Sequence, residues 1–160
     1  MLARIQGLIK RYRIAHIKKK LNKLDGVSIC GKISLGQYSQ INVVPGGKLS
    51  IGDNFYMNSY STINCRYSVT IGDNVLIGEN VHIYDHNHRF TDKEKPINAQ
   101  GFKTKEVMIG DNTWIGTGVT ILPGTAIGNN CVIGANCLVY GIIPENSVVR
   151  LSQKTEIVAK

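Results

Sequence analysis

Three of the four histidines in this 160-residue chain lie within seven positions, at His82, His86 and His88. A neutral imidazole titrates near neutral pH, so a histidine can take a proton from a hydroxyl group and later release it. Histidine nitrogens also bind zinc, usually as part of a tetrahedral ligand set. The stretch "IYDHNHRF", residues 83–90, therefore suits a catalytic base, a metal site or only a polar turn.

The spacing of these histidines argues against zinc. They crowd one short stretch, where Asp85 adds a single oxygen ligand, and the remaining histidine, His16, lies far away near the N-terminus. The four cysteines form no C-x-x-C pair. Three nitrogens on one loop rarely converge on a tetrahedral ion. We therefore expect no metal at this stretch.

The elements around the histidines repeat every six residues. Residues 69–80 read "VTIGDN VLIGEN", and five further hexads fill residues 107–136. The third residue of each hexad is a branched aliphatic, and glycine usually follows it. This period fits neither an α-helix nor an alternating strand, but it fits a coil with three flat faces. Fifteen such aliphatic positions predict an all-β fold of about five triangular coils, with Gly, Asn or Asp at the corners.

The repeat is interrupted at three places. Four extra residues occur near "VVPG", and two occur around Arg66–Tyr67. The step from Ile83 to Ile109 is one hexad plus 20 extra residues. The longest interruption predicts one extruded loop over residues 84–106. Cys131 and Cys137 occupy the small position of consecutive hexads. These two cysteines should lie on different faces and form no disulfide, as small buried residues in a reducing cytoplasm.

The N-terminal segment differs from the repeats. Residues 1–24 hold eight of the 19 Lys and Arg residues and no acid, so 11 basic residues balance 11 acidic ones in the rest of the chain. Its apolar residues predict two short amphipathic helices, or one kinked helix, over residues 1–25. The segment would cap the open end of the coils or contact anionic lipid or an acidic glycan, and these roles are compatible.

Several classes of protein are disfavoured by the same composition. The basic residues have little aromatic interleaving and match no nucleic-acid motif, so we expect no nucleic-acid partner. No apolar run approaches 18 residues, and no secretory signal follows the basic start. We expect a cytoplasmic protein, with a candidate peripheral contact between residues 1–24 and the inner face of the membrane.

The sequence resembles the hexapeptide-repeat acyltransferases. The matching stretches are "VTIGDNVLIGENVHIYDHNHRF", "GFKTKEVMIGDNTWIGTGVTILPGTAIGNNCVIGAN" and "IPENSVV". The resemblance is strongest to the maltose, galactoside and nodulation-factor O-acetyltransferases and to sugar O-acetyltransferases of surface polysaccharides. It implies a left-handed parallel β-helix over residues 26–149, followed by a C-terminal tail over residues 150–160. It also implies a homotrimer with active sites between subunits, and a loop that reaches over the neighbouring subunit.

The resemblance also implies roles for individual residues. His86 stands at the family's catalytic base, where it would deprotonate the acceptor hydroxyl, and His82 is expected to be an outward-facing bystander. The acceptor-binding positions are Asn58, Asp85 and His88. The positions that would bind acetyl-CoA are Trp114, Thr117, Ala135, Tyr140 and Arg150.

Some features depart from the family pattern. Tyr140 and Gly141 replace a Thr-Lys pair near the CoA phosphates, so the cation would come from Arg150 or Lys154. The partner that orients His86 stays open between Glu79, a backbone carbonyl and Asp85, although sequence neighbours seldom reach each other's rings well.

These features predict an acetyl-CoA-dependent O-acetyltransferase that acts on a sugar hydroxyl. The acceptor would belong to a bacterial surface polysaccharide such as capsule, O-antigen or exopolysaccharide. Two alternatives remain at this point. One is a zinc protein similar to the γ-type carbonic anhydrases, and the other is a non-catalytic β-helix that only binds.

Overall fold

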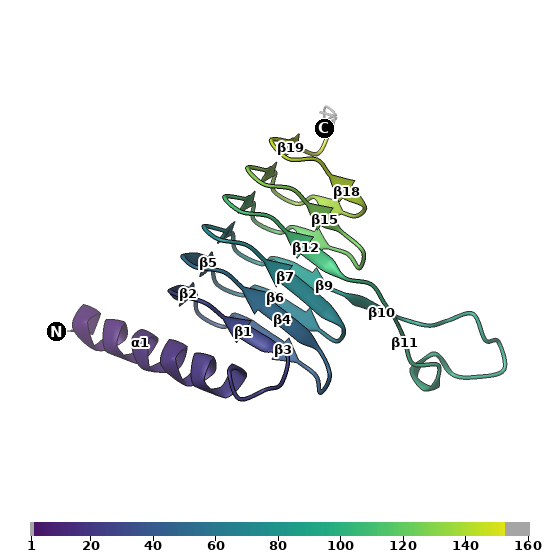
Figure 1. Cartoon of the computed structure of the whole chain (residues 1–160), viewed down its shortest axis with the longest axis horizontal. Coiled ribbons are helices and arrows are strands. Elements are labelled where there is room, and N and C mark those ends of the chain that lie inside the picture. The colour runs from purple at the N-terminus through teal and green to yellow at the C-terminus, as the bar shows by residue number, and fades with distance from the viewer. Residues whose placement is uncertain (1, 153–160) are drawn as a thin grey trace, which may run out of the picture.

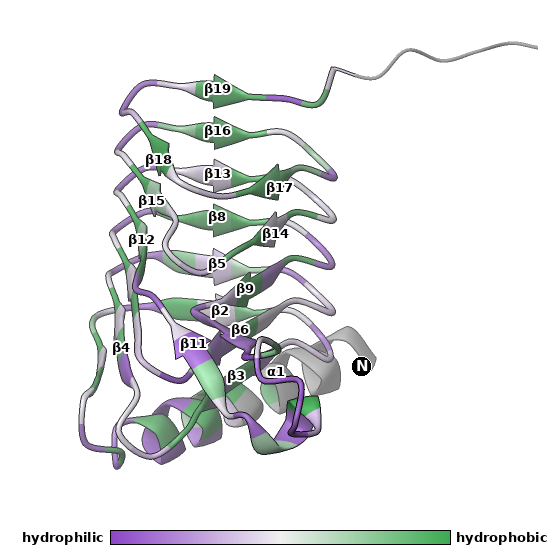
Figure 2. Cartoon of the chain, turned by 90° about the vertical axis from the view of Figure 1, so that its right-hand side faces the viewer, coloured by the Kyte–Doolittle hydropathy of each residue, from purple (hydrophilic) through white to green (hydrophobic). Residues whose placement is uncertain are grey.

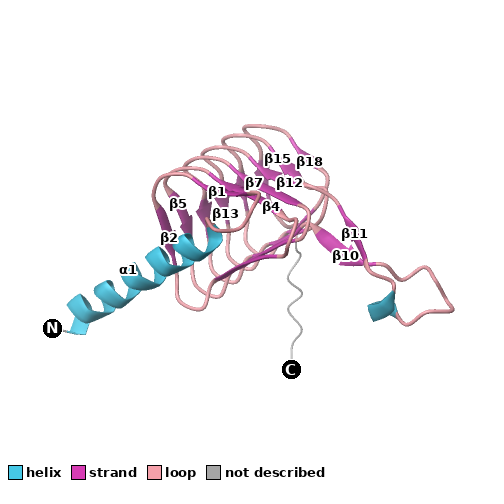
Figure 3. Ribbon diagram, turned by 60° about the horizontal axis from the view of Figure 1, so that its bottom comes forward, coloured by secondary structure: helices cyan, strands magenta, loops and turns pink. Residues whose placement is uncertain are grey.

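The computed structural model describes residues 2–152, and it shows a triangular prism built from three parallel sheets (Figure 1). Successive strands of the chain belong to the first, second and third sheet in turn, so each round of three strands is one turn of a β-helix. The helix α1 lies across one end of this prism, and a long insertion leaves its side (Figure 3). No helix within residues 2–152 is long and apolar enough to cross a membrane.

Each sheet contains one short strand from each turn. The first sheet contains β1 (Val27–Ile29), β4 (Lys48–Ile51), β7 (Ser68–Ile71), β12 (Val107–Ile109), β15 (Ala126–Ile127) and β18 (Ile142–Ile143). The second sheet contains β2 (Ile33–Leu35), β5 (Phe55–Met57), β8 (Leu76–Ile77), β13 (Trp114–Ile115), β16 (Val132–Ile133) and β19 (Val148–Val149). The third sheet contains β3 (Gln40–Val43), β6 (Thr62–Cys65), β9 (His82–Tyr84), β14 (Thr120–Ile121) and β17 (Leu138–Val139).

The aliphatic residue of each hexad points into the prism, as the repeat predicts. In the second sheet, for example, Ile77, Ile115 and Ile133 are paired across consecutive strands, and all three are fully buried. The small first positions of the hexads, including Val75, Val119 and Cys131, are buried beside them. One continuous column of side chains therefore forms the core, and each turn is stabilised mainly by its two neighbours.

The β-helix has about six turns rather than the five expected from the sequence. The two positions that the count missed are Ile143 in β18 and Val149 in β19. The step from Val139 to Ile143 is only four residues, because the loop at this corner is two residues shorter than usual. The period of six ends at this corner, so the repeat did not predict the last turn of the β-helix.

The three corners of the prism provide the frame for the site. We name them the first edge, between the first and second sheets, the second edge, between the second and third sheets, and the third edge, between the third and first sheets. Asparagines with positive φ close many of the turns, such as Asn74 and Asn112 at the first edge. Such backbone conformations favour Asn, which explains its repetition at these corners.

The helix α1 (Leu2–Leu21) is continuous, whereas the sequence predicted two helices or a kinked one. Its last turns cover the open end of the first coil, since Leu21 is buried and Ile14 and Ile17 pack against the core. The ammonium group of Lys18 donates a hydrogen bond to the carbonyl of Gly31 at 2.6 Å. The opposite end of the helix extends beyond the prism (Figure 1). Its capping role is therefore confined to its C-terminal part.

The long insertion begins and ends at the third edge. Its two arms, β10 (His86–His88) and β11 (Phe102–Thr104), pair antiparallel and are joined through the short helix η1 (Ile97–Ala99). The side chain of Gln100 holds the far part of the loop, because it accepts from the Asp92 backbone N–H and donates to the carbonyls of Asp92 and Lys95. In Figure 2 the insertion lies beside the turns nearest to α1.

Candidate active site

His86 and Asp85 form a hydrogen-bonded pair where the chain leaves the third sheet. Nδ1 of His86 lies 2.8 Å from Oδ1 of Asp85. The side chain of Asp85 is 0% exposed, whereas that of His86 is 19% exposed. The buried carboxylate of Asp85 therefore orients the imidazole through Nδ1. Nε2, on the other side of the ring, takes no part in this contact. A histidine fixed in this way through Nδ1 can use Nε2 as an acceptor of protons.

The carboxylate of Asp85 is fixed by the turn below it. Its oxygens accept hydrogen bonds from three consecutive backbone N–H groups, those of Arg66, Tyr67 and Ser68, at 2.6–3.0 Å. Every one of these partners is a donor, so Asp85 acts as an acceptor throughout. Nδ1 of His86 is consequently the donor in the pair. The two extra residues around Arg66–Tyr67 widen the corner and supply these N–H groups.

The position of Asp85 differs from the one expected. The sequence placed Asp85 at the acceptor, but its carboxylate is enclosed and all its contacts are with the protein. Its backbone carbonyl also accepts from the N–H of Lys105, where the insertion returns to the prism. Glu79, the other acid proposed by the sequence as a partner of His86, lies at the second edge instead. Of the candidate partners, Asp85 is the one that contacts the His86 ring, although neighbouring residues were not expected to reach each other well.

The ring of Phe102 contacts three side chains of the site, those of His86, His88 and Arg66. Its ring meets the His86 ring edge-on at 5.3 Å and the His88 ring at 4.4 Å, measured between ring centres. The guanidinium carbon of Arg66 lies 3.7 Å from the centre of the same ring. These contacts bring His86, His88 and Arg66 together, and they join the insertion to the turn below. The sequence singled out neither Arg66 nor Phe102 as a site residue.

His82 has a different environment from the other two histidines. It lies in β9 on the outer face of the third sheet, and its Nδ1 is 2.9 Å from Oγ1 of Thr62 on the neighbouring strand. Its outward position agrees with the sequence expectation. Within residues 2–152, no three His, Cys, Asp or Glu side chains gather as ligands of one metal would.

Asn58 and most of the residues expected near acetyl-CoA share the second edge. Asn58 follows β5, Thr117 follows β13, Ala135 follows β16 and Arg150 follows β19. The strand pairing stacks these ends directly above one another, turn by turn. Trp114 faces outward from β13 beside this edge and is 53% exposed. Of the five positions expected at acetyl-CoA, Thr117, Ala135 and Arg150 thus lie along one line of the prism, with successive turns about 4.8 Å apart, and Trp114 lies beside that line.

The amide of Asn58 is partly fixed. Its Oδ1 accepts from the backbone N–H of Ser59 at 2.8 Å, so the NH₂ group has no share in this contact. Tyr140 departs from the rest of the group, because it lies at the third edge, two turns above His86, and is exposed. Within one chain, therefore, His86 and Tyr140 lie at the third edge, and Asn58, Thr117, Ala135 and Arg150 lie at the second.

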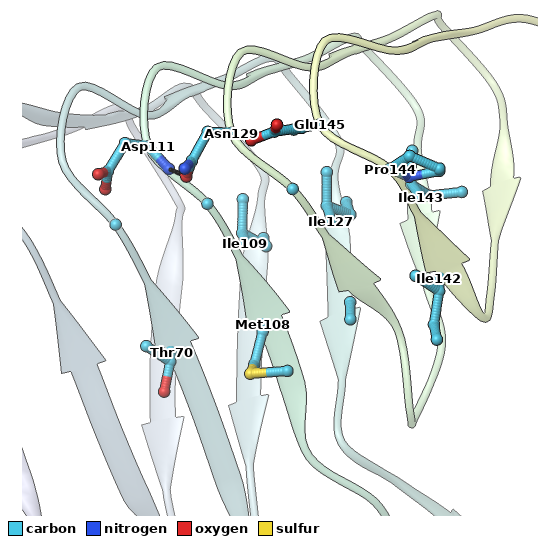
Figure 4. A pocket seen from close by; sticks show the side chains of 14 residues that line it. Thr70, Met108, Ile109, Asp111, Ile127, Asn129, Ile142, Ile143, Pro144 and Glu145 are labelled. Carbon is cyan, nitrogen blue, oxygen red and sulfur yellow. Dashed lines mark hydrogen bonds between the residues drawn. The ribbon is translucent and has the colours of Figure 1, made fainter.

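A separate shallow groove crosses the first sheet (Figure 4). Its lining includes the side chains of Met108 and Ile142, with Asp111, Asn129 and Glu145 along the first edge. The outer residues of this sheet change from Ser28, Ser50 and Thr70 in the lower turns to Met108, Ala126 and Ile142 in the upper ones. None of the expected site residues lines this groove.

Two family models match the repeats. The model described as bacterial transferase hexapeptide (six repeats) matches residues 106–141, and the model described as hexapeptide repeat of succinyl-transferase matches residues 64–83. Among curated relatives, the provisionally named lipopolysaccharide biosynthesis O-acetyl transferase WbbJ of Escherichia coli (strain K12) is 41% identical over 110 residues. That match covers 64% of this chain and 56% of the relative, so the chain spans about half the length of this relative.

Solved structures agree with the same grouping. A maltose O-acetyltransferase from Clostridium difficile 630 is 37% identical, with a TM-score of 0.69 over 82% of this chain and 67% of that one. A galactoside acetyltransferase in complex with coenzyme A is 35% identical, with a TM-score of 0.65 over 85% of this chain and 64% of that one. The repeats, the six-turn β-helix and these matches lead to one conclusion. The chain belongs to the hexapeptide-repeat acyltransferase family.

Proposed function

We propose that this protein transfers an acetyl group from acetyl-CoA to a hydroxyl group of a sugar, with His86 as the general base. The observation that carries the proposal is the Asp85–His86 pair, in which a buried carboxylate orients a half-buried imidazole. The names of the relatives support the reaction, since they are acetyltransferases, two of them acting on maltose or galactosides.

The transfer would proceed in one displacement. Nε2 of His86 takes the proton from the acceptor hydroxyl as the oxygen attacks the thioester carbonyl carbon. The carbon–sulfur bond then breaks, and the CoA sulfur leaves with a proton returned by His86. Asp85 keeps its place as acceptor of the Nδ1–H bond and stabilises the imidazolium that forms in between. No atom of the protein becomes acylated in this sequence.

Cys65, the thiol nearest to Asp85, is unsuited to act as a nucleophile. Its sulfur is buried and donates to the carbonyl of Lys48. Burial, followed by the negative charge of Asp85, raises the pKa of the Cys65 thiol to about 12. The thiolate is the reactive form, so Cys65 is inert at neutral pH. This supports direct transfer between the two substrates.

We further propose that each complete site forms between two subunits of a homotrimer. His86 and Tyr140 lie at the third edge, whereas Asn58, Trp114 and Thr117 lie at or beside the second, so one prism keeps the two groups apart. In a three-fold arrangement of parallel prisms, each subunit presents different surfaces to its two neighbours, so the third edge of one subunit can meet the second edge of the next. Acetyl-CoA would then lie along the second edge, and Tyr140 of the neighbour would join it.

The line of residues on the second edge suits an extended cosubstrate. Trp114 offers an exposed aromatic face, and the exposed Thr117 in the same turn and Ala135 one turn above add only small side chains to this edge. Arg150 lies one turn beyond Ala135 and supplies a positive charge for the phosphates. The order from Asn58 to Arg150 thus runs from the acceptor, through the acyl group and the pantetheine arm, to the nucleotide end.

We place the reaction in surface polysaccharide synthesis near the inner face of the bacterial membrane. The similarity to WbbJ, which is named for lipopolysaccharide biosynthesis, supports this setting. The helix α1 adds support, because it extends beyond the prism and its segment carries eight basic residues and no acid. Its exposed Leu8 and Tyr12 are suited to insertion between lipid headgroups.

The test is an assay of acetyl-CoA consumption with a panel of sugars and glycan fragments. We expect turnover in the wild type and a loss of about 100-fold or more in kcat for His86→Asn. The matched control is His82→Asn, which replaces a histidine of the same stretch at the outer face of the third sheet. Equal activity of wild type and His86→Asn would contradict the assignment of the base.

A further inference from the structure

We propose that Arg66 forms an anion-binding site beside His86, and that the acceptor is an acidic sugar whose carboxylate or phosphate group binds there. The inference rests on the proposed function and names the class of acceptor. Arg66 lies at the third edge, one turn below the start of the insertion. Its backbone N–H contributes to holding Asp85, while its side chain turns to the ring of Phe102.

The side chain of Arg66 is held in place but is not neutralised. Its guanidinium lies over the face of Phe102 at 3.7 Å, an attractive cation–π contact. Its Nε is buried and has no hydrogen-bond partner among residues 2–152. No carboxylate in that range forms an ion pair with it. The guanidinium is thus a partly buried positive charge that no carboxylate of residues 2–152 pairs with, and burying a charge without a partner costs free energy.

The neighbouring acids are already engaged. The oxygens of Asp85 accept from backbone N–H groups and from His86. The carboxylate of Glu106 accepts from the hydroxyl of Ser68 at 2.9 Å. The two Nη groups of Arg66 make no hydrogen bond within residues 2–152 and, unlike Nε, are not enclosed. They present a planar pair of donors, which matches the two oxygens of a carboxylate or phosphate.

The position of the guanidinium connects it to the reaction. Arg66 and His86 contact the same Phe102 ring, with the guanidinium carbon 3.7 Å and the imidazole centre 5.3 Å from its centre, so the two groups are at most about 9 Å apart. One sugar ring can therefore place a hydroxyl at Nε2 of His86 and an acidic substituent at Arg66. A neutral sugar would leave the guanidinium without its partner, and selectivity between the two follows from this difference.

The first test compares matched acceptors. Methyl galactopyranosiduronate and methyl galactopyranoside share one ring and differ in a carboxylate, and galactose 6-phosphate supplies the other anion. We expect the wild type to favour an acidic acceptor in kcat/KM, and Arg66→Gln to reduce the acidic-to-neutral ratio by about 10- to 100-fold. The matched control, Lys93→Gln, removes one exposed positive charge from the insertion and should leave the ratio unchanged. The acidic acceptor whose kcat/KM falls more in Arg66→Gln shows whether the site prefers a carboxylate or a phosphate group.

The second test needs no turnover. The ¹⁵N–¹H resonance of Arg66 Nε, assigned with Arg66→Lys, is followed while each sugar or free CoA is added. We expect a shift with an acidic sugar and none with the neutral one. Three results would overturn the anion site. The first is an equal loss of kcat/KM for the acidic and the neutral acceptor in Arg66→Gln, and the second is a wild-type preference for the neutral acceptor. The third is a shift of the Arg66 Nε resonance when CoA alone is added.

The two proposals fail in different ways. If an acidic sugar moves the Arg66 resonance but no sugar is acetylated, the anion site stands and the proposed reaction is wrong. If neutral sugars are acetylated and no acidic sugar moves that resonance, the reaction stands and the anion site is wrong.

Discussion

Asp85 and His86 meet although residues at neighbouring positions of a strand point to opposite faces. The chain bends out of the coil between β9 and β10, and the contact forms at this bend. The sequence singled out His86 as the candidate base, but it left the orienting partner open between Asp85, Glu79 and a backbone carbonyl. A signal was present in the two extra residues around Arg66–Tyr67, whose N–H groups lie one turn below Asp85. Only the stacking of turns reveals that these residues meet.

Replacing Asp85 tests the orienting contact. Asp85→Asn keeps the shape but turns an NH₂ group toward His86 or toward the backbone N–H groups. We expect kcat to fall about 100-fold. We also expect the free energy of unfolding to fall by about 1–3 kcal/mol, because buried donors lose their acceptor. Urea denaturation and acetyl-CoA turnover measure the two effects.

Asp111→Asn is the matched control for Asp85→Asn. Asp111 accepts from the backbone N–H of Asp73 at the first edge, and Asn129 makes the same contact with Asp111 one turn above. The fold thus already uses an asparagine in this role, so Asp111→Asn should change neither quantity appreciably. Equal changes of kcat and of the free energy of unfolding in Asp85→Asn and Asp111→Asn would contradict the orienting role of Asp85.

The cysteines provide a second test at this scale. Cys30 is exposed, whereas Cys65, Cys131 and Cys137 are buried. We expect a thiol reagent at pH 8 to modify one cysteine rapidly in the native protein and all four after denaturation. The pKa of Cys65 is raised in the folded state, so this thiol stabilises the fold below its ordinary pKa of 9.0. That contribution is lost as the pH rises from 9.0 toward about 12.

Rapid modification of a second cysteine in the native protein would show that the core opens. The pH effect is isolated by comparing the wild type with Cys65→Ala. The free energy of unfolding should decline more steeply above pH 9 in the wild type, because only its unfolded state releases the Cys65 proton there.

At the scale of elements, the repeat predicted the inward residues, the corner residues and the extent of the insertion well. The period describes spacing along one chain, so it fails where a corner changes length. The step from Val139 to Ile143 is such a place, and the sixth turn was missed there. The apolar residues of the N-terminal segment predicted two helices or a kinked one, whereas the structure has one continuous α1.

The glycines that follow the inward aliphatic residues set the contact between turns. A Cβ atom on Gly116 would lie 2.8 Å from the Ala135 nitrogen and 2.9 Å from the Ile133 carbonyl oxygen, both backbone atoms. The two turns would have to separate, so we expect Gly116→Ala to lower the free energy of unfolding by about 1–3 kcal/mol. Gly134→Ala, one turn above, is the control, because its closest approach is 3.1 Å. Equal losses in the two variants would contradict this reading of the stacking.

The insertion should be separable from the prism in stability. Gln100→Ala removes the three side-chain hydrogen bonds that hold the far part of the loop. We expect faster proteolysis within residues 90–100, with little change in the urea midpoint, because the core contacts are untouched. A parallel fall in the midpoint would show that the prism depends on the loop.

At the scale of the whole molecule, the candidate site residues fall into two groups at different edges. The sequence indicated the residues of both groups, but it could not assign them to edges, since this requires the sheet to which each strand belongs. His86 lies at the third edge, and Asn58 and Thr117 lie at the second. The account therefore depends on a neighbouring subunit that supplies the missing edge.

Mixed trimers test this claim most directly. His86→Ala and Asn58→Ala chains are each expected to be nearly inactive alone, and they are combined in equal amounts by unfolding and refolding together. If each site takes His86 from one subunit and Asn58 from the next, about a quarter of the sites regain both residues, and about a quarter of wild-type activity returns. If both residues of each site came from the same chain, mixing would restore no activity, and the proposed arrangement of the site would be wrong.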